Sequence, residues 1–504
     1  MVILDVGDES RHASVYRIYR EIAQTDNLYS TQQNLKAFAI KPKTEVVDYK
    51  LGINEVVIGF KTPEFRPGNE QKVDLGFMKI NKESGEPSFD AQRIVIAGSP
   101  GTGKTWMLDT MIAAYHTKFE IRHLHFDPKK EYWTRRFPIW ADGVTYKGKF
   151  LKNPFSKPLA YQQKIDLHLA QFGMKRKGYD LYIVRPLYLG EEEGIDKHYC
   201  LTWLDVMQLW ALDPKNAPKY VAEVLGLTGS KTNKDILTQA MSDPTIRTWV
   251  QAEARIGQLV KDASSTASLI FQAIKTSRAR RVISDDLTRR FDFLAEIALH
   301  DTIVFAGELP EIGDEEDEDD KIYNGFCKWL IKLLEKDVYA DIRRNKSSKY
   351  PAGVLLSADE ADAVAGKKGQ TLRRSFVRAY NKLRGYGFNT LLATQELQNL
   401  DSSLITNAST LISSRATRGL ANDAEKSGGN LDAIKSSFRI NSLAESALKD
   451  LPVRVQTTIG TIVSGFAILR KDKAPEIVFP EIPPAQPMET TTAEGGVKGL
   501  KVAL

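Results

Sequence analysis

A glycine-rich loop between Gly98 and Thr105 has the residue types and spacing of a phosphate-binding site. Its sequence, Gly98-Ser-Pro-Gly-Thr-Gly-Lys-Thr105, fits the pattern G-x-x-x-x-G-K-[ST], with the apolar run Ile94–Ala97 before it and a helical run after it. Glycines let backbone N–H groups surround an anion, and the following helix N-terminus adds partial positive charge. We therefore expect ATP binding by Gly98, Ser99, Pro100, Gly101, Thr102, Gly103, Lys104, Thr105 and Trp106.

Hydrolysis requires further groups around such a loop. Lys104 can reach the β- and γ-phosphates, and the Thr105 hydroxyl can bind Mg²⁺. Asp359 and Glu360 follow the apolar run Val354-Leu-Leu-Ser-Ala358, which is typical of a strand. Although alternation along a strand would separate adjacent side chains, a turn at the strand end allows both to face the phosphates. We expect Asp359 to be a Mg²⁺ ligand and Glu360 to be the general base.

Three further side chains are candidates for catalysis. Gln395 ends the next apolar run, where it can hydrogen-bond the γ-phosphate or the attacking water. Arg384 precedes that run, and Arg415 follows the next one. In oligomeric ATPases an arginine from a neighbouring subunit stabilises the transferring phosphoryl group, and we expect Arg384 first and Arg415 second in this role. Surface ion pairing is the alternative for each arginine.

The elements that must position these residues follow one another as strand, helix and strand from Ala91 onward, which favours an α/β fold with a parallel sheet. Residues 1–90 read as a small, partly β module, and 91–154 and 296–480 as the two parts of the ATPase core. Amphipathic runs between 155 and 295 predict a helical insertion. The acidic run 314–320 is interpreted as a solvated loop, and 481–504 as a flexible C-terminal tail.

Composition excludes several classes of protein. The chain has 504 residues, 42% hydrophobic and 27% charged, and no uncharged apolar run of membrane-spanning length. We expect no direct membrane insertion and no signal peptide. The two cysteines, Cys200 and Cys327, suit neither a disulfide framework nor a metal knuckle, so a cytoplasmic location is expected. A net charge of +6 is too small by itself to indicate nucleic-acid binding.

The motifs in combination resemble the HerA/FtsK superfamily of DNA-translocating ATPases, and within it the HerA-like branch. The resemblance rests on the phosphate loop, Asp127-Pro-Lys-Lys-Glu131, Asp359-Glu-Ala-Asp362, Arg384-Gly-Tyr-Gly387, Ala393-Thr-Gln395 and Ile405–Ile412, in this order. It implies a RecA-like P-loop NTPase core, a barrel-like N-terminal module, ATP and Mg²⁺ as cofactors, and a hexameric ring. Two departures are the Pro-Gly-Thr spelling of the loop and the polar Ser357 before Asp359.

The same loop spelling is typical of AAA+ machines that remodel proteins. Those ATPases place the acidic pair a few tens of residues after the loop, whereas 255 residues separate Lys104 from Asp359 here. A glutamine rather than an asparagine also ends the following strand. The translocase interpretation is therefore favoured over AAA+ remodelling.

A translocating ring needs basic groups that contact DNA phosphates. The best candidates follow the acidic pair, and the glycines beside them permit movement with nucleotide state. The resemblance implies non-specific binding of double-stranded DNA and a nuclease or other effector as partner; a nucleotide-gated scaffold for an effector enzyme stays an alternative. The expected DNA-binding residues are Lys367, Lys368, Arg373 and Arg374.

Overall fold

The computed structural model describes residues 55–480 with internal gaps, together with the short segment 501–503. The longer internal gaps are 81–86, 129–142, 153–180, 308–317, 346–352, 366–375 and 417–429. Residues 1–54, which make up most of the predicted N-terminal module, lie outside the described part. None of the described helices is long and apolar enough to cross a membrane.

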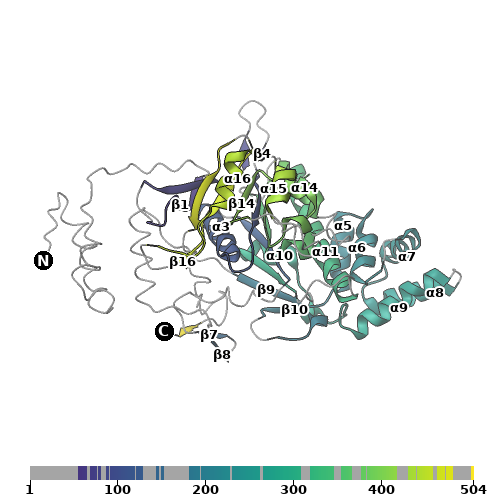
Figure 1. The fold of residues 1–504 in the computed structure, drawn as a ribbon. Coiled ribbons are helices and arrows are strands. Elements are labelled where there is room, and N and C mark those ends of the chain that lie inside the picture. The colour runs from purple at the N-terminus through teal and green to yellow at the C-terminus, as the bar shows by residue number, and fades with distance from the viewer. Residues whose placement is uncertain are drawn as a thin grey trace, which may run out of the picture.

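A twelve-stranded mixed sheet forms the centre of the molecule (Figure 1). Eight neighbouring strands are parallel, and four strands extend the sheet in antiparallel pairing. The parallel part, in spatial order, is β10 (Lys197–Tyr199), β9 (Leu181–Pro186), β11 (Thr302–Ala306), β6 (Arg122–Asp127), β12 (Val354–Ala358), β13 (Phe388–Thr394), β5 (Arg93–Ala97) and β14 (Thr410–Ser413). The antiparallel part continues with β17 (Phe466–Leu469), β18 (Glu476–Pro480), β1 (Glu55–Phe60) and β2 (Glu70–Asp74).

The central strands are apolar and buried on both faces, as parallel sheets covered by helices require. Every residue of β11, β12 and β13 is buried. The two largest hydrophobic cores among the described residues lie on opposite faces of the sheet. In one, α3 (Lys104–Lys118) packs with β1 and β2; the other includes α11 (Glu318–Asn345). The predicted α/β fold with a mainly parallel core sheet is confirmed.

The strand order decides which residues can meet. β13 lies between β5, which leads into the phosphate loop, and β12, which leads into Asp359 and Glu360. All three strands run in the same direction, so their carboxyl ends share one edge of the sheet. Ligand sites in open α/β sheets occur at this edge.

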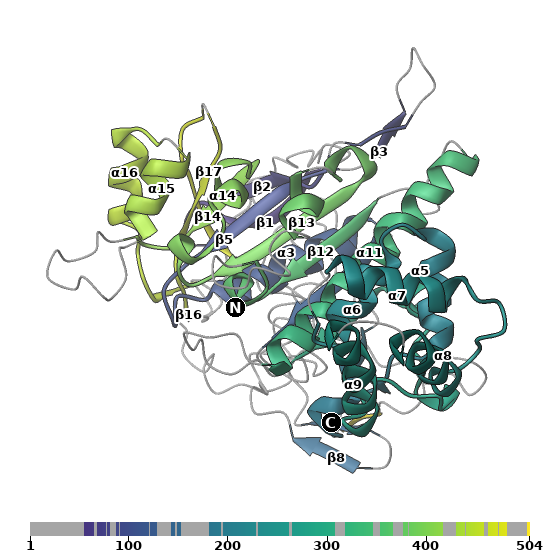
Figure 2. The same cartoon turned by 90° about the vertical axis from the view of Figure 1, so that its right-hand side faces the viewer.

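A group of helices covers one end of the sheet, within the range 155–295 predicted as a helical insertion (Figure 2). The range also contains β9 and β10, which pair in the main sheet, so the described helices begin only at Trp203. The six-residue run of β9 is too short to separate strand from helix by periodicity alone. The helices are α5 (Trp203–Leu212), α6 (Ala217–Val224), α7 (Lys231–Ser242), α8 (Trp249–Lys261) and α9 (Ser265–Ala279), followed by α10 (Phe293–Leu299).

The described part of residues 1–90 is continuous with the core. β1 pairs with β18, and β2 pairs with β1, at the antiparallel end of the main sheet. Val56 and Val73 share a hydrophobic core with residues of α3. A separate hairpin joins β3 (Met78–Ile80) to β4 (Pro87–Phe89). β1 and β2 are therefore the last two strands at the antiparallel end of the main sheet rather than parts of an independent module.

A small three-stranded sheet includes the C-terminal segment. β19 (Lys501–Ala503), in the range predicted as a flexible tail, pairs with β7 (Gly143–Tyr146), which pairs with β8 (Lys149–Lys152).

Two further helices lie at the end of the main sheet that is opposite to α5–α9. Figure 2 shows α15 (Asn430–Phe438) and α16 (Ser442–Lys449) lying together there.

Candidate nucleotide-binding and hydrolysis site

The loop predicted to bind phosphate connects β5 to α3 at the carboxyl edge of the sheet. Gly101 and Gly103 adopt φ angles of 73° and 85°, in the left-handed region that side chains disfavour. Gly103 caps α3, so Lys104, Thr105 and Trp106 occupy the first helical turn. The N–H groups of a first helical turn point out of the helix end, where an anion binds favourably.

Gly98 is required for close packing rather than for its φ angle. A Cβ at this position would lie 2.7 Å from Ser414 Oγ and 2.6 Å from Thr102 Oγ1. Thr102 Oγ1 in turn donates a hydrogen bond to the Ser99 carbonyl at 2.8 Å, which closes the loop on itself. The loop therefore lies against the end of β14, where the N–H of the next residue, Ser414, donates to Ala97 O.

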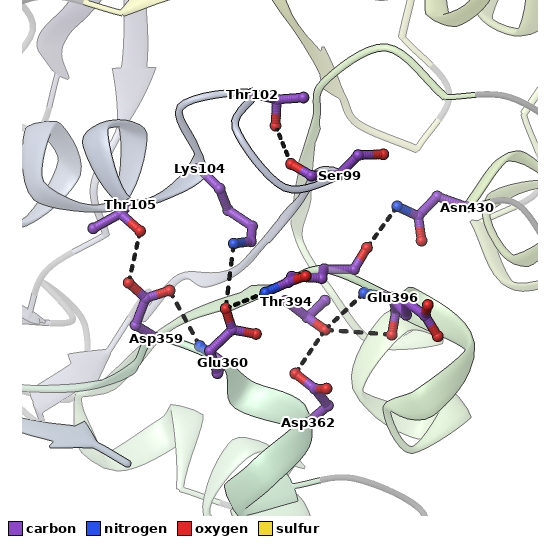
Figure 3. A network of polar contacts seen from close by, with 11 residues as sticks. Ser99, Thr102, Lys104, Thr105, Asp359, Glu360, Asp362, Thr394, Glu396 and Asn430 are labelled. Atoms are coloured by element: carbon purple, nitrogen blue, oxygen red, sulfur yellow. Dashed lines mark hydrogen bonds and ion pairs between the residues drawn. The ribbon is translucent and has the colours of Figure 1, made fainter. Parts of the chain in front are cut away.

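The side chains of Asp359 and Thr105, the two predicted Mg²⁺ ligands, are in contact (Figure 3). The Thr105 hydroxyl donates to Asp359 Oδ2 at 2.9 Å, although 254 positions separate the two residues. Asp359 is 4% exposed. A hydroxyl and a carboxylate oxygen are hard donors that suit Mg²⁺, which binds through one or two carboxylates plus substrate phosphates. The described residues contain no group of three or more His, Cys, Asp or Glu that could hold a metal by itself.

Glu360 turns back into the site because its backbone is left-handed. Its φ angle is 50°, unusual for a non-glycine residue, and its N–H donates to Asp359 Oδ1 at 3.1 Å. The carboxylate lies 3.6 Å from Lys104 Nζ, and both residues are less than a tenth exposed. Adjacent side chains of a regular strand would point to opposite faces. The positive φ angle of Glu360 breaks this alternation, so that Asp359 and Glu360 both face the loop.

Gln395 directly follows β13 and reaches Glu360. Its Nε2 donates to Glu360 Oε1 at 2.6 Å. Beside it, the Thr394 hydroxyl donates to Asp362 Oδ1 at 3.1 Å, and this connects β13 to α12 (Ala361–Ala365). The lysine of the loop, the glutamate after β12 and the glutamine after β13 thus form one continuous polar chain.

The two arginine candidates lie at opposite edges of the sheet. Arg415 is exposed and follows β14, at the same edge as the phosphate loop. Arg384 precedes β13, in the short 3₁₀ turn Arg384–Tyr386. The seven residues of β13 separate Arg384 from the site of its own chain, a span of about 20 Å. Arg384 could therefore act on nucleotide only in a neighbouring subunit.

The position of Arg384 is consistent with the electrostatics at the amino end of β5. Burial lowers the pKa of the Arg93 guanidinium, and the positive charge of nearby Arg384 lowers it further, while Tyr380 opposes the shift. Arg93 is the first residue of β5 and lies five positions before the loop. Two positive charges therefore gather at the edge of the sheet that faces away from the phosphate loop.

The predicted DNA-binding residues, Lys367, Lys368, Arg373 and Arg374, lie outside the described residues. Elsewhere, the basic segment around Arg278 has acidic partners. Arg278 lies 2.9 Å from Glu253, and Arg280 forms an ion pair with Asp319. These two arginines are engaged within the chain and make poorer candidates for phosphate contacts.

The residue pattern missed two groups that support the site. Asp362 accepts from Thr394, and Asn430, at the start of α15, binds the backbone on either side of residue 396. Asp362 stands in a predicted motif, but nothing in the pattern indicates its partner. Asn430 comes 35 residues after Gln395, and only the packing of α15 brings the two together.

A buried polar column lies on the α3 face of the sheet. His123 and His125 of β6 flank Ser357 of β12, with His123 Nε2 and His125 Nδ1 2.5 and 2.6 Å from the serine Oγ. His123 Nδ1 also contacts Thr302 Oγ1, which contacts His116 Nε2 of α3 at 3.0 Å. Strand alternation places Ser357 on the same face as Asp359. The polar residue before Asp359, a departure from the family pattern, thus has two buried partners.

Comparisons with known proteins give no family assignment. No protein family model matches this chain. No curated protein matches it either.

Three solved structures illustrate the similarity in the course of the chain. VirB4 of Thermoanaerobacter pseudethanolicus covers 85% of this chain and 96% of its own, at 11% identity and a TM-score of 0.40. The match to the bacterial conjugative coupling protein TrwB covers 88% of this chain and 96% of TrwB, at 12% identity and a TM-score of 0.45. The match to the genome packaging NTPase B204 of Sulfolobus turreted icosahedral virus 2 covers 78% of this chain and 98% of B204, at 12% identity and a TM-score of 0.32. At these identities and TM-scores, the similarities assign no activity to this chain.

Proposed function

We propose that this chain is an ATPase that moves double-stranded DNA as a ring, most simply a hexamer. One observation carries the ATPase part. Lys104, Glu360 and Gln395 come from three neighbouring parallel strands and form one polar chain at their shared carboxyl edge, beside the Thr105–Asp359 pair. This arrangement supports the proposal, because nucleotide hydrolysis needs a phosphate-binding lysine, a general base and a cation site close together.

Binding of ATP would use the loop from Gly98 to Trp106. The backbone N–H groups of the first turn of α3 would donate to the phosphates, and Lys104 would move from Glu360 to the β- and γ-phosphates. Thr105 and Asp359 would hold Mg²⁺, which supplies positive charge to the phosphate oxygens. Phosphate oxygens would compete with Glu360 for Lys104. The distance from Lys104 Nζ to Glu360 Oε1 is 3.6 Å, which is longer than a charge-assisted hydrogen bond.

Hydrolysis would follow from the release of Glu360 by Lys104. Water attacks the γ-phosphorus and loses a proton to the Glu360 carboxylate, while the bond from the γ-phosphorus to the leaving ADP oxygen breaks. Gln395 would orient the water or Glu360 through its side-chain amide. An arginine from a neighbouring subunit, with Arg384 before Arg415, would stabilise the charge of the transferring phosphoryl group.

The DNA part of the proposal rests on position in the chain. The basic segment containing Lys367, Lys368, Arg373 and Arg374 follows α12, which starts directly after Glu360 and contains Asp362. A change at Glu360 can therefore be transmitted to that segment. Contacts of lysine and arginine with phosphates are insensitive to base sequence and sensitive to salt. A nuclease or other effector is the expected partner of such a motor.

The test is phosphate release by the purified chain with and without duplex DNA. Glu360→Gln should keep nucleotide affinity and lower hydrolysis at least about 100-fold, because the amide cannot accept the proton. Glu445→Gln, which removes a carboxylate that pairs with Lys435 on the α15–α16 helices, is the matched control and should hydrolyse normally. Reversing charge with Lys367→Glu and Lys368→Glu should abolish the stimulation by DNA and spare basal hydrolysis.

Each alternative function has its own outcome in this experiment. Stimulation by unfolded polypeptide instead of DNA would favour AAA+ remodelling. A Glu360→Gln chain that binds ATP and still delivers its output to an effector would favour the nucleotide-gated scaffold. A wild-type chain that binds no nucleotide would refute the ATPase itself, whatever its assembly state.

A further inference from the structure

The first residue of α15 makes an unusual contact with the backbone that follows β13. Asn430 Nδ2 donates to the Gln395 carbonyl at 2.9 Å (Figure 3). Asn430 Oδ1 accepts from the Leu397 N–H, also at 2.9 Å. A neighbouring strand in a parallel sheet offers the same pair of bonds, to the C=O of one residue and the N–H two positions later. The side chain of Asn430 therefore continues the support of β13 beyond the end of its ladder.

Two side-chain contacts anchor the backbone on either side of the Gln395 side chain. On one side, Thr394 donates to Asp362 of α12; on the other, Asn430 holds the carbonyl of Gln395. Between these two anchors, the Gln395 side chain donates to Glu360 at 2.6 Å. A one-ångström misplacement of a catalytic group can reduce the rate about 100-fold, so the anchors bear on hydrolysis.

The support of Asn430 is itself well packed. Leu431 and Ile434 of α15 are fully buried in the same core as Leu397 and Leu404, and α15 contacts both the 3₁₀ turn Leu397–Asn399 and α14 (Ser402–Thr406). Asn430 is therefore held by a packed helix. A displacement of α15 would move the Asn430 amide relative to Gln395.

We propose that Asn430 is a positioning residue that holds Gln395 on Glu360, so that α15 is coupled to the hydrolytic site. The inference rests on the proposed ATPase function and deepens it. The Asn430 side chain bonds to the backbone of Gln395 and Leu397, so it would act through the backbone of Gln395. Its loss should therefore lower kcat and leave nucleotide binding nearly unchanged.

The test measures kcat and the Kd for a fluorescent ATP analogue in full-length variants. Asn430→Ala should lower kcat about tenfold or more, with Kd within about threefold of wild type. Asn441→Ala is the matched control: Asn441 Oδ1 accepts from Ala444 N–H at the start of α16, so this variant loosens the same helix pair away from the site. It should lower the melting temperature and leave kcat unchanged. Asn430→Asp, which keeps the acceptor for Leu397 and loses the donor to Gln395, serves if the alanine variant fails to fold.

A double variant decides whether Asn430 acts through Gln395. In the Gln395→Ala background, Asn430→Ala should change kcat less than about twofold, because the group it positions is gone. An equal loss of kcat in both backgrounds, or a kcat in Asn430→Ala that matches Asn441→Ala, would overturn the inference while leaving the ATPase intact. Absence of hydrolysis by the wild-type chain would instead overturn the proposed function.

Discussion

At the scale of single residues, the site depends on backbone conformations that side-chain chemistry alone does not indicate. Gly101 and Gly103 supply left-handed turns in the loop, and Glu360 adopts one despite its side chain. Non-glycine residues in this region cost of order 1–3 kcal/mol, which the surrounding contacts must offset. For Glu360 those contacts are the Asp359 carboxylate, Lys104 and Gln395.

Gly98 provides a prediction at this scale. Gly98→Ala should raise the Kd for nucleotide about tenfold, because the new Cβ would overlap Ser414 Oγ and Thr102 Oγ1, and overpacking typically costs about 1–3 kcal/mol. Isothermal titration with a non-hydrolysable ATP analogue measures the change. Gly385→Ala is the control, because a Cβ there meets nothing within 4 Å and the φ angle is not left-handed. Equal affinities in the two variants would contradict this role of Gly98.

At the scale of elements, strands β6 and β12 are joined by more than their backbone ladder. Ser357 can donate to only one of His123 and His125, so the other histidine must donate to the serine oxygen. The direction of the Ser357 hydroxyl therefore determines which ring nitrogen of His123 and of His125 carries the hydrogen. Thr302 lies between His123 and His116, so the direction of its hydroxyl links the protonated nitrogens of these two rings in the same way. The column beneath Asp359 is therefore a single cooperative network.

Ser357→Ala should lower the free energy of unfolding by about 2–3 kcal/mol, because it leaves buried histidine nitrogens without their shared partner. Urea unfolding measures this change. The control is Thr390→Val in β13, another fully buried strand hydroxyl, which has no hydrogen-bond partner in the part of the chain that the structure describes. Its loss should be neutral or stabilising. The network would have no role in stability if both variants unfolded at the same urea concentration.

At the scale of the whole molecule, the sheet separates two surfaces. The carboxyl edge of the parallel strands carries the candidate nucleotide site and Arg415, and the amino edge carries Arg384. A ring in which the amino edge of one subunit faces the carboxyl edge of the next would bring Arg384 to a neighbour's nucleotide. This head-to-tail contact closes into a ring when its rotation permits.

Mixing two inactive variants tests this arrangement. Lys104→Ala disables its own site but keeps Arg384, and Arg384→Ala keeps an intact site. In randomly mixed rings about one quarter of sites would combine both intact groups, so hydrolysis should recover to about 25% of wild type. Steady-state phosphate release, with light scattering to verify mixed assembly, is the measurement. Mixed rings that stay inactive would exclude Arg384, and recovery with Arg415→Ala in its place would identify Arg415 instead.

Some features of the site could be predicted from the sequence, and others could not. The spacing from Gly98 to Thr105, and the apolar runs before Asp359 and Gln395, were enough to predict that the loop, Asp359 and Gln395 lie at one edge of the sheet, because parallel strands bring their carboxyl ends together. Short strands were harder: β9 fell within a predicted helical range, and β1 and β2 were assigned to a separate module.

The sequence by itself determined the chemistry of the loop and the strand ends, because those residue types act over a few neighbouring positions. Only the tertiary structure decided that Arg384 lies at the far edge, that Ser357 bridges two histidines, and that Asn430 holds Gln395. These contacts join segments 35 to 234 positions apart. Pairings of that kind depend on strand order and helix packing, which no local pattern of residues specifies.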